Sequence, residues 1–191
     1  EFIKAKVEEH HYQPPYFRLM ERLNLEGANA APRVMRPRLL GLEDLGESGA
    51  DHLVDVREPL AYAAGHMQGA VCLPVGMIPA FAGWFISEGD TIALIASEED
   101  ELAQAMAHLV RIGLDNIVGG YVGVIPAAAQ GKAMQSIAMI DTEEVARRLA
   151  EDSEDWTLLD VRALDERQQG SIDESEHVYV GELNTRWKEL D

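Results

Sequence analysis

This chain contains an internal sequence repeat, which constrains the fold more than any other feature of the sequence. Leu53-Val54-Asp55-Val56-Arg57 returns as Leu158-Leu159-Asp160-Val161-Arg162, at an offset of 105 residues (160 − 55). Gly65 recurs as Gly170 and Val75-Gly76 recurs as Val180-Gly181 at the same offset. Solenoid repeats have periods of about 20–50 residues. The longer offset therefore predicts a duplicated domain.

The repeated unit alternates strands and helices. Residues 53–56 favour a strand, and Glu58-Pro59 opens a helical turn because Pro is tolerated in the first turn of a helix. Residues 70–73 favour a second short strand, and this order predicts a parallel α/β layer. The most hydrophobic run, residues 91–96, is typical of the central strand of a parallel sheet, and a helix over 99–112 follows it.

The remaining elements follow from apolar spacing and from Gly and Pro breaks. We expect strands at 38–40, 116–118, 136–140, 158–162 and 178–180, helices at 2–9, 16–25, 42–45, 78–86, 143–149 and 182–190, and linkers at 28–37 and 123–132.

The second copy is expected to be incomplete. The counterpart of strand 91–96 would lie at 196–201, beyond Asp191. A half-built parallel sheet leaves apolar edges exposed, which is an aggregation liability. Either another chain completes this half, or the chain is a truncated piece, and we favour truncation. The start at Glu1 rather than Met likewise indicates a processed product or a fragment.

The charge composition restricts the classes of partner that this chain is expected to bind. The 34 acidic and 16 basic residues give a net charge of −18, which disfavours nucleic acid and anionic membranes as partners. The simplest interpretation is a soluble acidic surface. The sequence shows no run of about 18 apolar residues and no signal peptide. A single cysteine fits a reducing compartment, so we expect a cytoplasmic location.

A larger motif surrounds the first repeat. Asp55-Val56-Arg57-Glu58-Pro59, followed by Tyr62, Ala64-Gly65-His66, Gly69-Ala70 and Pro74, resembles the signature of the rhodanese-like domain. The resemblance implies a parallel sheet flanked by helices, with a sulfurtransferase cysteine in an active-site loop. We expect one rhodanese-like domain at 32–128 and a partial second one at 133–191.

The N-terminal residues resemble a different protein class. Pro14-Pro15-Tyr16-Phe17, Met20 and Asn24-Leu25-Glu26-Gly27 are similar to the end of the metallo-β-lactamase-fold domain in persulfide-dioxygenase-like proteins. This resemblance implies that residues 1–31 are a helical arm, the tail of such a domain. The parent protein would then be a metal-dependent hydrolase or persulfide dioxygenase, with iron or zinc in the part that precedes Glu1. That domain and a second copy of the chain are the expected partners.

The loop that would carry the chemistry is degenerate. In the family the cysteine directly follows the central strand, where this chain has Ala96 and continues Ser97-Glu98-Glu99-Asp100-Glu101-Leu102. Alanine offers no nucleophile, and four consecutive carboxylates repel anionic sulfur and raise the pKa of a nearby thiol. Related phosphatase chemistry needs a cysteine and an arginine at the loop ends, which are Ala96 and Leu102 here. We therefore predict no catalytic residue in this chain.

The other candidate residues favour structural roles. Asp55 with Arg57, and Asp160 with Arg162, are expected to tie neighbouring loops by hydrogen bonds. His66 is expected to make a local hydrogen bond, because its counterpart is Ser171. Cys72 is expected to be a buried core thiol.

No metal site is predicted. His10-His11 is the only adjacent histidine pair, which supplies too few ligands. Trp84, Phe85 and Trp187 fit a core better than a ligand cage.

Three hypotheses follow. The first is a catalytically inactive rhodanese-like module of a metallo-β-lactamase-fold, sulfur-handling protein, serving packing, assembly or substrate delivery. The second is a thiosulfate or persulfide sulfurtransferase whose cysteine lies in the second copy, near position 201. The third is a stand-alone interaction domain without a metal-binding partner domain.

Overall fold

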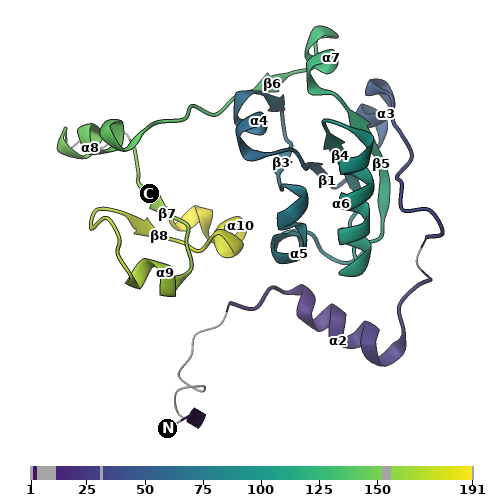
Figure 1. Ribbon diagram of the computed structural model, residues 1–191, viewed down its shortest axis with the longest axis horizontal. Coiled ribbons are helices and arrows are strands. Elements are labelled where there is room, and N and C mark those ends of the chain that lie inside the picture. The colour runs from purple at the N-terminus through teal and green to yellow at the C-terminus, as the bar shows by residue number, and fades with distance from the viewer. Residues whose placement is uncertain (1, 4–11, 31, 152–155, 191) are drawn as a thin grey trace.

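The computed structural model describes residues 2–3, 12–30, 32–151 and 156–190 (Figure 1). Its centre is a four-stranded, fully parallel sheet in the order β3-β1-β4-β5. The strands are β1 (His52–Asp55), β3 (Val71–Cys72), β4 (Ile92–Ala96) and β5 (Ile117–Val122). All five residues of β4 are buried, as an apolar run at the centre of a parallel sheet requires. The predicted α/β class and central strand are confirmed.

Helices cover both faces of this sheet. On one face α5 (Ile78–Phe81) and α6 (Glu99–Arg111) enclose a core that includes Val54, Leu94 and Leu102. On the other face α3 (Leu42–Glu47) and α7 (Val124–Ala129) supply Leu45, Val124 and Ala127 to a second core around Ile95. Helix α4 (Pro59–Ala64) joins β1 to β2 (His66–Met67). The expected parallel sheet flanked by helices is therefore what the chain forms.

The N-terminal arm packs on this domain. Helix α2 (Tyr16–Glu26) places Tyr16 and Met20 against the first core. The Tyr16 hydroxyl donates to the carbonyl of Pro79, 2.9 Å away, and Arg22 pairs with Glu88. Residues 4–11 of the arm, which include most of the helix predicted at 2–9 and the His10-His11 pair, lie outside the described residues.

The chain after the domain begins with an extended connection and α8 (Thr142–Ala150), whose first turn is capped by Asp141 accepting from the Glu144 amide at 2.9 Å. We call residues 158–190 the C-terminal segment. It holds β7 (Leu159–Asp160), α9 (Leu164–Gln168), β8 (Glu176–His177) and α10 (Leu183–Arg186), with 3-10 turns at Val180–Glu182 and Trp187–Glu189. The order strand, helix, strand, 3-10 turn, helix, 3-10 turn also describes β1, α4, β3, Val75–Met77, α5 and Ala82–Trp84, except that β2 lies between α4 and β3 in the domain.

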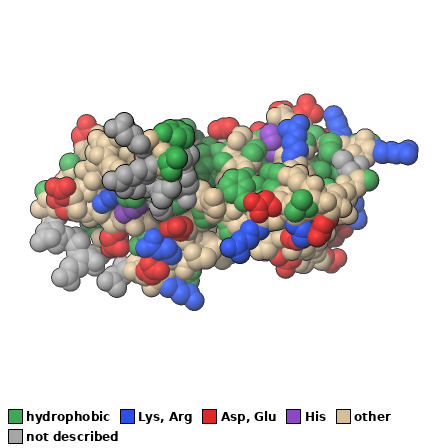
Figure 2. All heavy atoms as spheres, turned by 90° about the horizontal axis from the view of Figure 1, so that it is seen from below, with side chains coloured by type: hydrophobic (Ala, Val, Ile, Leu, Met, Phe, Trp, Pro, Cys, Tyr) green, Lys and Arg blue, Asp and Glu red, His purple; other side chains and the backbone are tan. Residues whose placement is uncertain are grey.

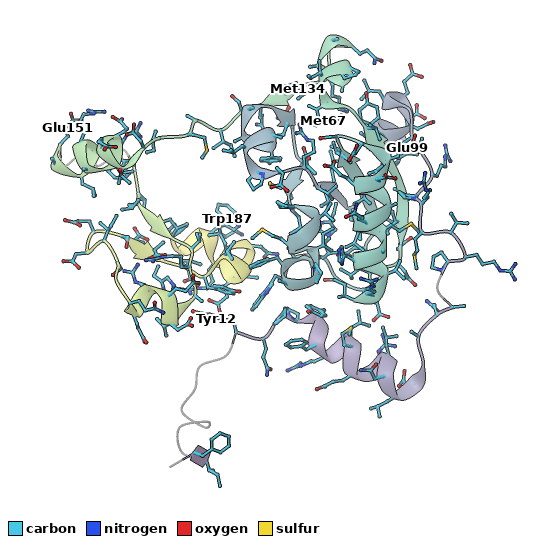
Figure 3. All side chains as sticks on the ribbon, viewed as in Figure 1. Tyr12, Met67, Glu99, Met134, Glu151 and Trp187 are labelled. Carbon is cyan, nitrogen blue, oxygen red and sulfur yellow. The ribbon has the colours of Figure 1, made fainter. Side chains whose placement is uncertain are left out.

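Several predicted elements are wrong or shifted. Residues 136–140 form no strand; instead β6 (Met134–Gln135) pairs antiparallel with β2, so that Met134 lies opposite Met67 (Figure 3). The linker predicted at 123–132 contains helix α7. The strand predicted at 178–180 lies earlier, at Glu176–His177. The apolar run at 136–140 has the composition of a strand, but no described strand lies beside it to form a ladder.

The predicted strand at 38–40 is a single parallel bridge between Leu39 and Gly120, with amide–carbonyl distances of 2.8 Å on both sides. Among the described helices, none has the length and apolar character needed to cross a membrane. Acidic and basic side chains are interspersed on the face seen in Figure 2.

Candidate functional site

The end of β1 carries a buried ion pair that we call the first latch: Asp55, Arg57 and the carbonyl of Gly65. Arg57 Nε donates to Asp55 Oδ1 at 2.8 Å, and Nη2 donates to Oδ2 at 2.6 Å. The same Nη2 donates to the Gly65 carbonyl at 2.8 Å. This is the bidentate geometry that suits a guanidinium fork and a carboxylate. Both charged groups are engaged with each other and with the backbone, so they tie the end of β1 to the end of α4.

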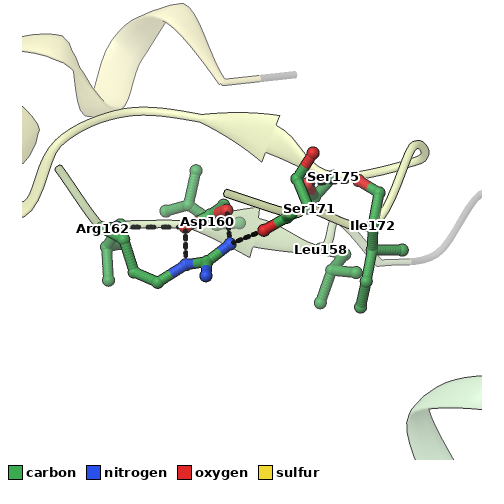
Figure 4. Close-up of a pocket in the computed structure, with 9 residues that line it drawn as sticks. Leu158, Asp160, Arg162, Ser171, Ile172 and Ser175 are labelled. Carbon is green, nitrogen blue, oxygen red and sulfur yellow. Dashed lines mark hydrogen bonds and ion pairs between the residues drawn. The ribbon is translucent and has the colours of Figure 1, made fainter. Parts of the chain in front are cut away.

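The C-terminal segment contains the same arrangement, the second latch, formed by Asp160, Arg162 and the carbonyl of Gly170 (Figure 4). Its three distances are 2.9, 2.7 and 2.9 Å, which closely match those of the first latch. The hydrogen bonds from Arg162 hold the pKa of Asp160 far below its usual range, so this carboxylate stays ionised. An open pocket of about 630 Å³ lies beside the latch.

The two latches differ in exposure. The side chain of Arg57 is 10% exposed, whereas that of Arg162 is 46% exposed. The difference arises because β1 lies between β3 and β4, while β7 pairs with β8 alone among the described strands.

His66 is held beneath a tyrosine. Its ring stacks on that of Tyr62 with centroids 3.8 Å apart and an interplanar angle of 9°. Its Nδ1 lies 2.9 Å from the Tyr62 carbonyl, and the residue is 4% exposed. The Tyr62 hydroxyl donates to the Ala70 carbonyl at 2.7 Å. The pair therefore fixes the chain between α4 and β3, as a local hydrogen-bonding role for His66 requires.

An arginine replaces this tyrosine in the C-terminal segment. Arg167 stands 105 residues after Tyr62, and Ser175 stands 105 residues after Ala70. Arg167 donates from Nη2 to the Ser175 carbonyl at 3.0 Å and from Nη1 to its Oγ at 2.8 Å. Hence the same carbonyl receives a side-chain donor in both places. Sequence reasoning missed Tyr62 and Arg167 as partners, although the constant offset was the available signal.

The degenerate loop is very short in three dimensions. Ala96, the last residue of β4, is fully buried, and α6 begins only three residues later at Glu99. The Ser97 amide, which precedes the helix N-terminus, donates to Glu101 Oε2 at 2.7 Å. A backbone donor at the position where an anion would be bound is thus already occupied by the protein's own carboxylate.

The acidic start of α6 has an unexpected partner. Arg36, from the chain that leads into the domain, lies 3.4 Å from Asp100 Oδ1 and 3.7 Å from Glu99 Oε2. These carboxylates are also favoured by the helix N-terminus. Arg36 was not singled out from the sequence, because nothing in a lone arginine of a linker indicates which helix it will meet.

Leu102 closes the loop from below. Its side chain is fully buried, and a Cβ placed on Gly120 would lie 2.7 Å from its Cδ1. The position that carries an arginine in related phosphatase chemistry is therefore a core position here. Glu98, Glu99 and Asp100 are exposed at the start of the helix, whereas Glu101 is half-buried.

Cys72 does not lie in the core as predicted. It is half-buried because β3 is an edge strand of the sheet and pairs only with β1. Burial raises the pKa of its thiol, and the nearby Asp55 carboxylate adds to the effect. A thiol of this kind is a poor nucleophile at neutral pH because little of it is thiolate.

The aromatic predictions were partly wrong. Trp84 and Phe85 are half-buried, but Trp187 is 57% exposed because it lies on the C-terminal segment where no described element covers it. Within the described residues no group of three or more His, Cys, Asp or Glu side chains could hold a metal ion.

Comparison with known proteins gives one family. Residues 41–126 match the model of the family described as the rhodanese-like domain. This match lies inside the range 32–128 expected from the sequence. None of the curated proteins compared with this chain matches it.

Several solved structures are similar. The metallo-beta-lactamase from Staphylococcus aureus subsp. aureus COL is 24% identical with a TM-score of 0.53, covering 63% of this chain and 34% of that protein. This chain thus spans about a third of that protein's length. A rhodanese-related protein from Thermoplasma volcanium is 24% identical with a TM-score of 0.44, covering 51% of this chain and 97% of its own. Thiosulfate sulfurtransferase from Pseudomonas aeruginosa is 15% identical with a TM-score of 0.45, covering 81% and 36%.

Proposed function

We propose that the rhodanese-like domain formed by residues 41–126 is catalytically silent and serves packing, assembly or substrate delivery within a larger sulfur-handling protein. The observation that carries this proposal is the state of the loop after β4. A buried Ala96 stands where the family has its cysteine, and Glu101 occupies the Ser97 amide beside it.

The chemistry of sulfur transfer explains why this observation supports the proposal. A sulfurtransferase needs a thiolate that attacks the donor sulfur, and amide donors that stabilise the anionic sulfur formed. The loop lacks the thiol, and its exposed carboxylates repel thiosulfate or a persulfide anion. The only thiol, Cys72, lies on another strand, and its raised pKa keeps it protonated.

The wider context is also a proposal. The sequence resemblance of residues 14–27, together with the fold-level likeness to the S. aureus metallo-beta-lactamase, supports a preceding metallo-β-lactamase-fold domain. In this proposal iron or zinc would belong to the metallo-β-lactamase-fold domain, and that domain would be the partner of the rhodanese-like domain. The whole protein would be cytoplasmic and would form homo-oligomers. The matched latches at Asp55 and Asp160 support a partial second rhodanese-like copy in the C-terminal segment.

One observation favours the alternative, a sulfurtransferase centred on the second copy. The second latch keeps the geometry of the first although the segment contributes only two strands to its sheet. In this alternative the preserved latch would frame a complete active-site loop. The cysteine in that case would lie near position 201.

Thiosulfate:cyanide assays test the proposal. We expect the purified chain and its Cys72→Ser variant both to form no thiocyanate above the background of a protein-free reaction, with an active sulfurtransferase as positive control. Intact mass after incubation with thiosulfate should show no added sulfur atom. Sustained turnover that is lost on Cys72→Ser would identify Cys72 as a nucleophile and contradict the proposal; turnover that survives would place the chemistry elsewhere and contradict it equally.

A further inference from the structure

The joint between the rhodanese-like domain and the C-terminal segment is made by aromatic side chains from three parts of the chain. Tyr12, on the arm, stacks on Tyr179 with ring centroids 3.9 Å apart and an interplanar angle of 20°. Tyr179 in turn meets Trp84 of the domain edge-on, at 5.5 Å and 75°. The ring of Tyr179 is thus held between the arm and the domain. Figure 3 shows Tyr12 on the arm beside the C-terminal segment.

The close approach of these parts depends on two glycines. A Cβ on Gly181 would lie 2.5 Å from ring atoms of Trp84 and 2.8 Å from Tyr179. A Cβ on Gly83 would overlap the ring of Tyr16, whose hydroxyl bonds to the Pro79 carbonyl. Both contacts exist only because no side chain stands in the way.

Burial and charge agree with this placement. Burial raises the pKa of both Tyr12 and Tyr179, and the nearby Glu182 adds to this effect for Tyr12. The Tyr12 ring therefore lies against the C-terminal segment and is half-buried there.

Away from these aromatic rings, the domain and the C-terminal segment are not closely packed against each other. Between the described residues of 41–126 and those of 158–190 there is no hydrogen bond or ion pair. An open groove of about 760 Å³ separates them, with apolar walls that include Phe81, Leu183 and Trp187. The joint is therefore closely packed at the stacked aromatic rings and open at the groove, so these rings are what holds the segment in place.

We propose that Tyr12, Trp84, Tyr179 and Gly181 form a clamp by which the N-terminal arm fixes the orientation of the C-terminal segment on the rhodanese-like domain. The clamp couples Tyr12 to the C-terminal segment: when the Tyr12 ring leaves its stack, Tyr179 is released, and the segment then swings about its extended connection at 136–141 while α2 stays on the domain. This inference is independent of whether the domain transfers sulfur, because none of the four residues belongs to the degenerate loop.

The internal repeat supplies a matched control for the test. Gly76 stands 105 residues before Gly181, at the equivalent turn of the domain, and nothing lies within 4 Å of the Cβ it would carry. We expect Gly181→Ala and Tyr12→Ala each to raise the radius of gyration measured by small-angle X-ray scattering. Both should speed amide exchange over 178–182 several-fold. Gly76→Ala should leave both readouts unchanged, and Tyr12→Phe, which keeps the stacked ring, should retain most of the wild-type behaviour.

The amide exchange of β1 and β4 provides the check on folding in every variant. If amide exchange at β1 and β4 is unchanged while exchange over 178–182 is faster, the variant has lost the clamp and has kept the fold of the domain. Wild-type scattering and wild-type exchange in both Tyr12→Ala and Gly181→Ala would overturn the proposal. So would an equal response in Gly76→Ala.

Discussion

At the scale of single residues, the two latches are one chemical arrangement placed in two environments. Asp55 and Arg57 are enclosed by the sheet, whereas Arg162 is nearly half exposed. Buried ion pairs and exposed ones differ in what their removal does. Breaking a buried pair leaves a charge without a partner in a poorly solvated place, and an exposed charge is readily hydrated.

Arg57→Ala is therefore expected to lower the free energy of unfolding by about 3–5 kcal/mol, because it leaves the buried Asp55 uncompensated. The equivalent Arg162→Ala should produce a much smaller loss, because Arg167 Nη1 still donates to Asp160 Oδ2 at 3.2 Å and keeps this carboxylate paired. Urea unfolding of each variant measures the loss of free energy of unfolding. Amide exchange at β1 and at β7 shows which of the two strands is destabilised. Equal losses at the two sites would show that Arg167 does not compensate Asp160 when Arg162 is removed.

At the scale of elements, the sequence predicted those parts whose signal is local. β4 was expected from its uninterrupted apolar run, and α6 from apolar spacing ended by Gly113. The strand predicted at 136–140 was wrong because a strand also needs a neighbouring strand to pair with, and an apolar run does not specify one. Helix α7 was missed because Pro126 and small residues indicate a linker, yet Pro is tolerated near a helix start.

The site was predictable in the same uneven way. The loss of the cysteine at Ala96 is visible in the sequence alone, and so are the paired Asp and Arg residues. The contact of Arg36 with Asp100 and the stack of Tyr12 on Tyr179 join residues far apart in the chain. Only the folded arrangement brings such residues together.

The starts of β1 and β4 are joined by a reciprocal set of hydrogen bonds. The Asp51 amide donates to Thr91 Oγ1 at 2.9 Å, while the Thr91 amide and hydroxyl donate to Asp51 Oδ2 at 2.8 and 2.6 Å. The Thr91 hydroxyl, followed by its amide, lowers the pKa of Asp51. The ionised carboxylate is thus the form that the folded state prefers.

This lowered pKa predicts a pH dependence. Its stabilisation is fully present above the unfolded value of about 4 and is lost as the pH falls through the lower folded value. Asp51→Asn and Thr91→Val should therefore each flatten the decline of the urea midpoint between roughly pH 5 and pH 2. A decline as steep as that of the unaltered chain in both variants would contradict this account.

At the scale of the whole molecule, the arm is a structural part of the domain on which it lies. Tyr16 packs over Gly83, and a Cβ on Gly113 would lie 2.8 Å from the Leu23 side chain. The rhodanese-like domain therefore has its first core extended by residues that precede the matched range 41–126.

Gly83→Ala is expected to destabilise the chain by about 1–3 kcal/mol, as overpacking does, because its methyl group overlaps the Tyr16 ring. In a Tyr16→Ala background the same substitution should be nearly neutral, since the overlap is gone. Thermal unfolding of the four chains of this double-mutant cycle measures the coupling. Additive effects would mean that Tyr16 does not lie over Gly83 in solution.

The latch has a consequence for the order in which the chain folds. Its three members span only the residues from Asp55 to Gly65, or from Asp160 to Gly170, so closing it requires no distant part of the sequence. Contacts between near neighbours form early, because little chain entropy is lost in closing a small loop. Each latch thus requires only its own short stretch of chain, and during synthesis the first is able to close before β4, which pairs with β1, has been made.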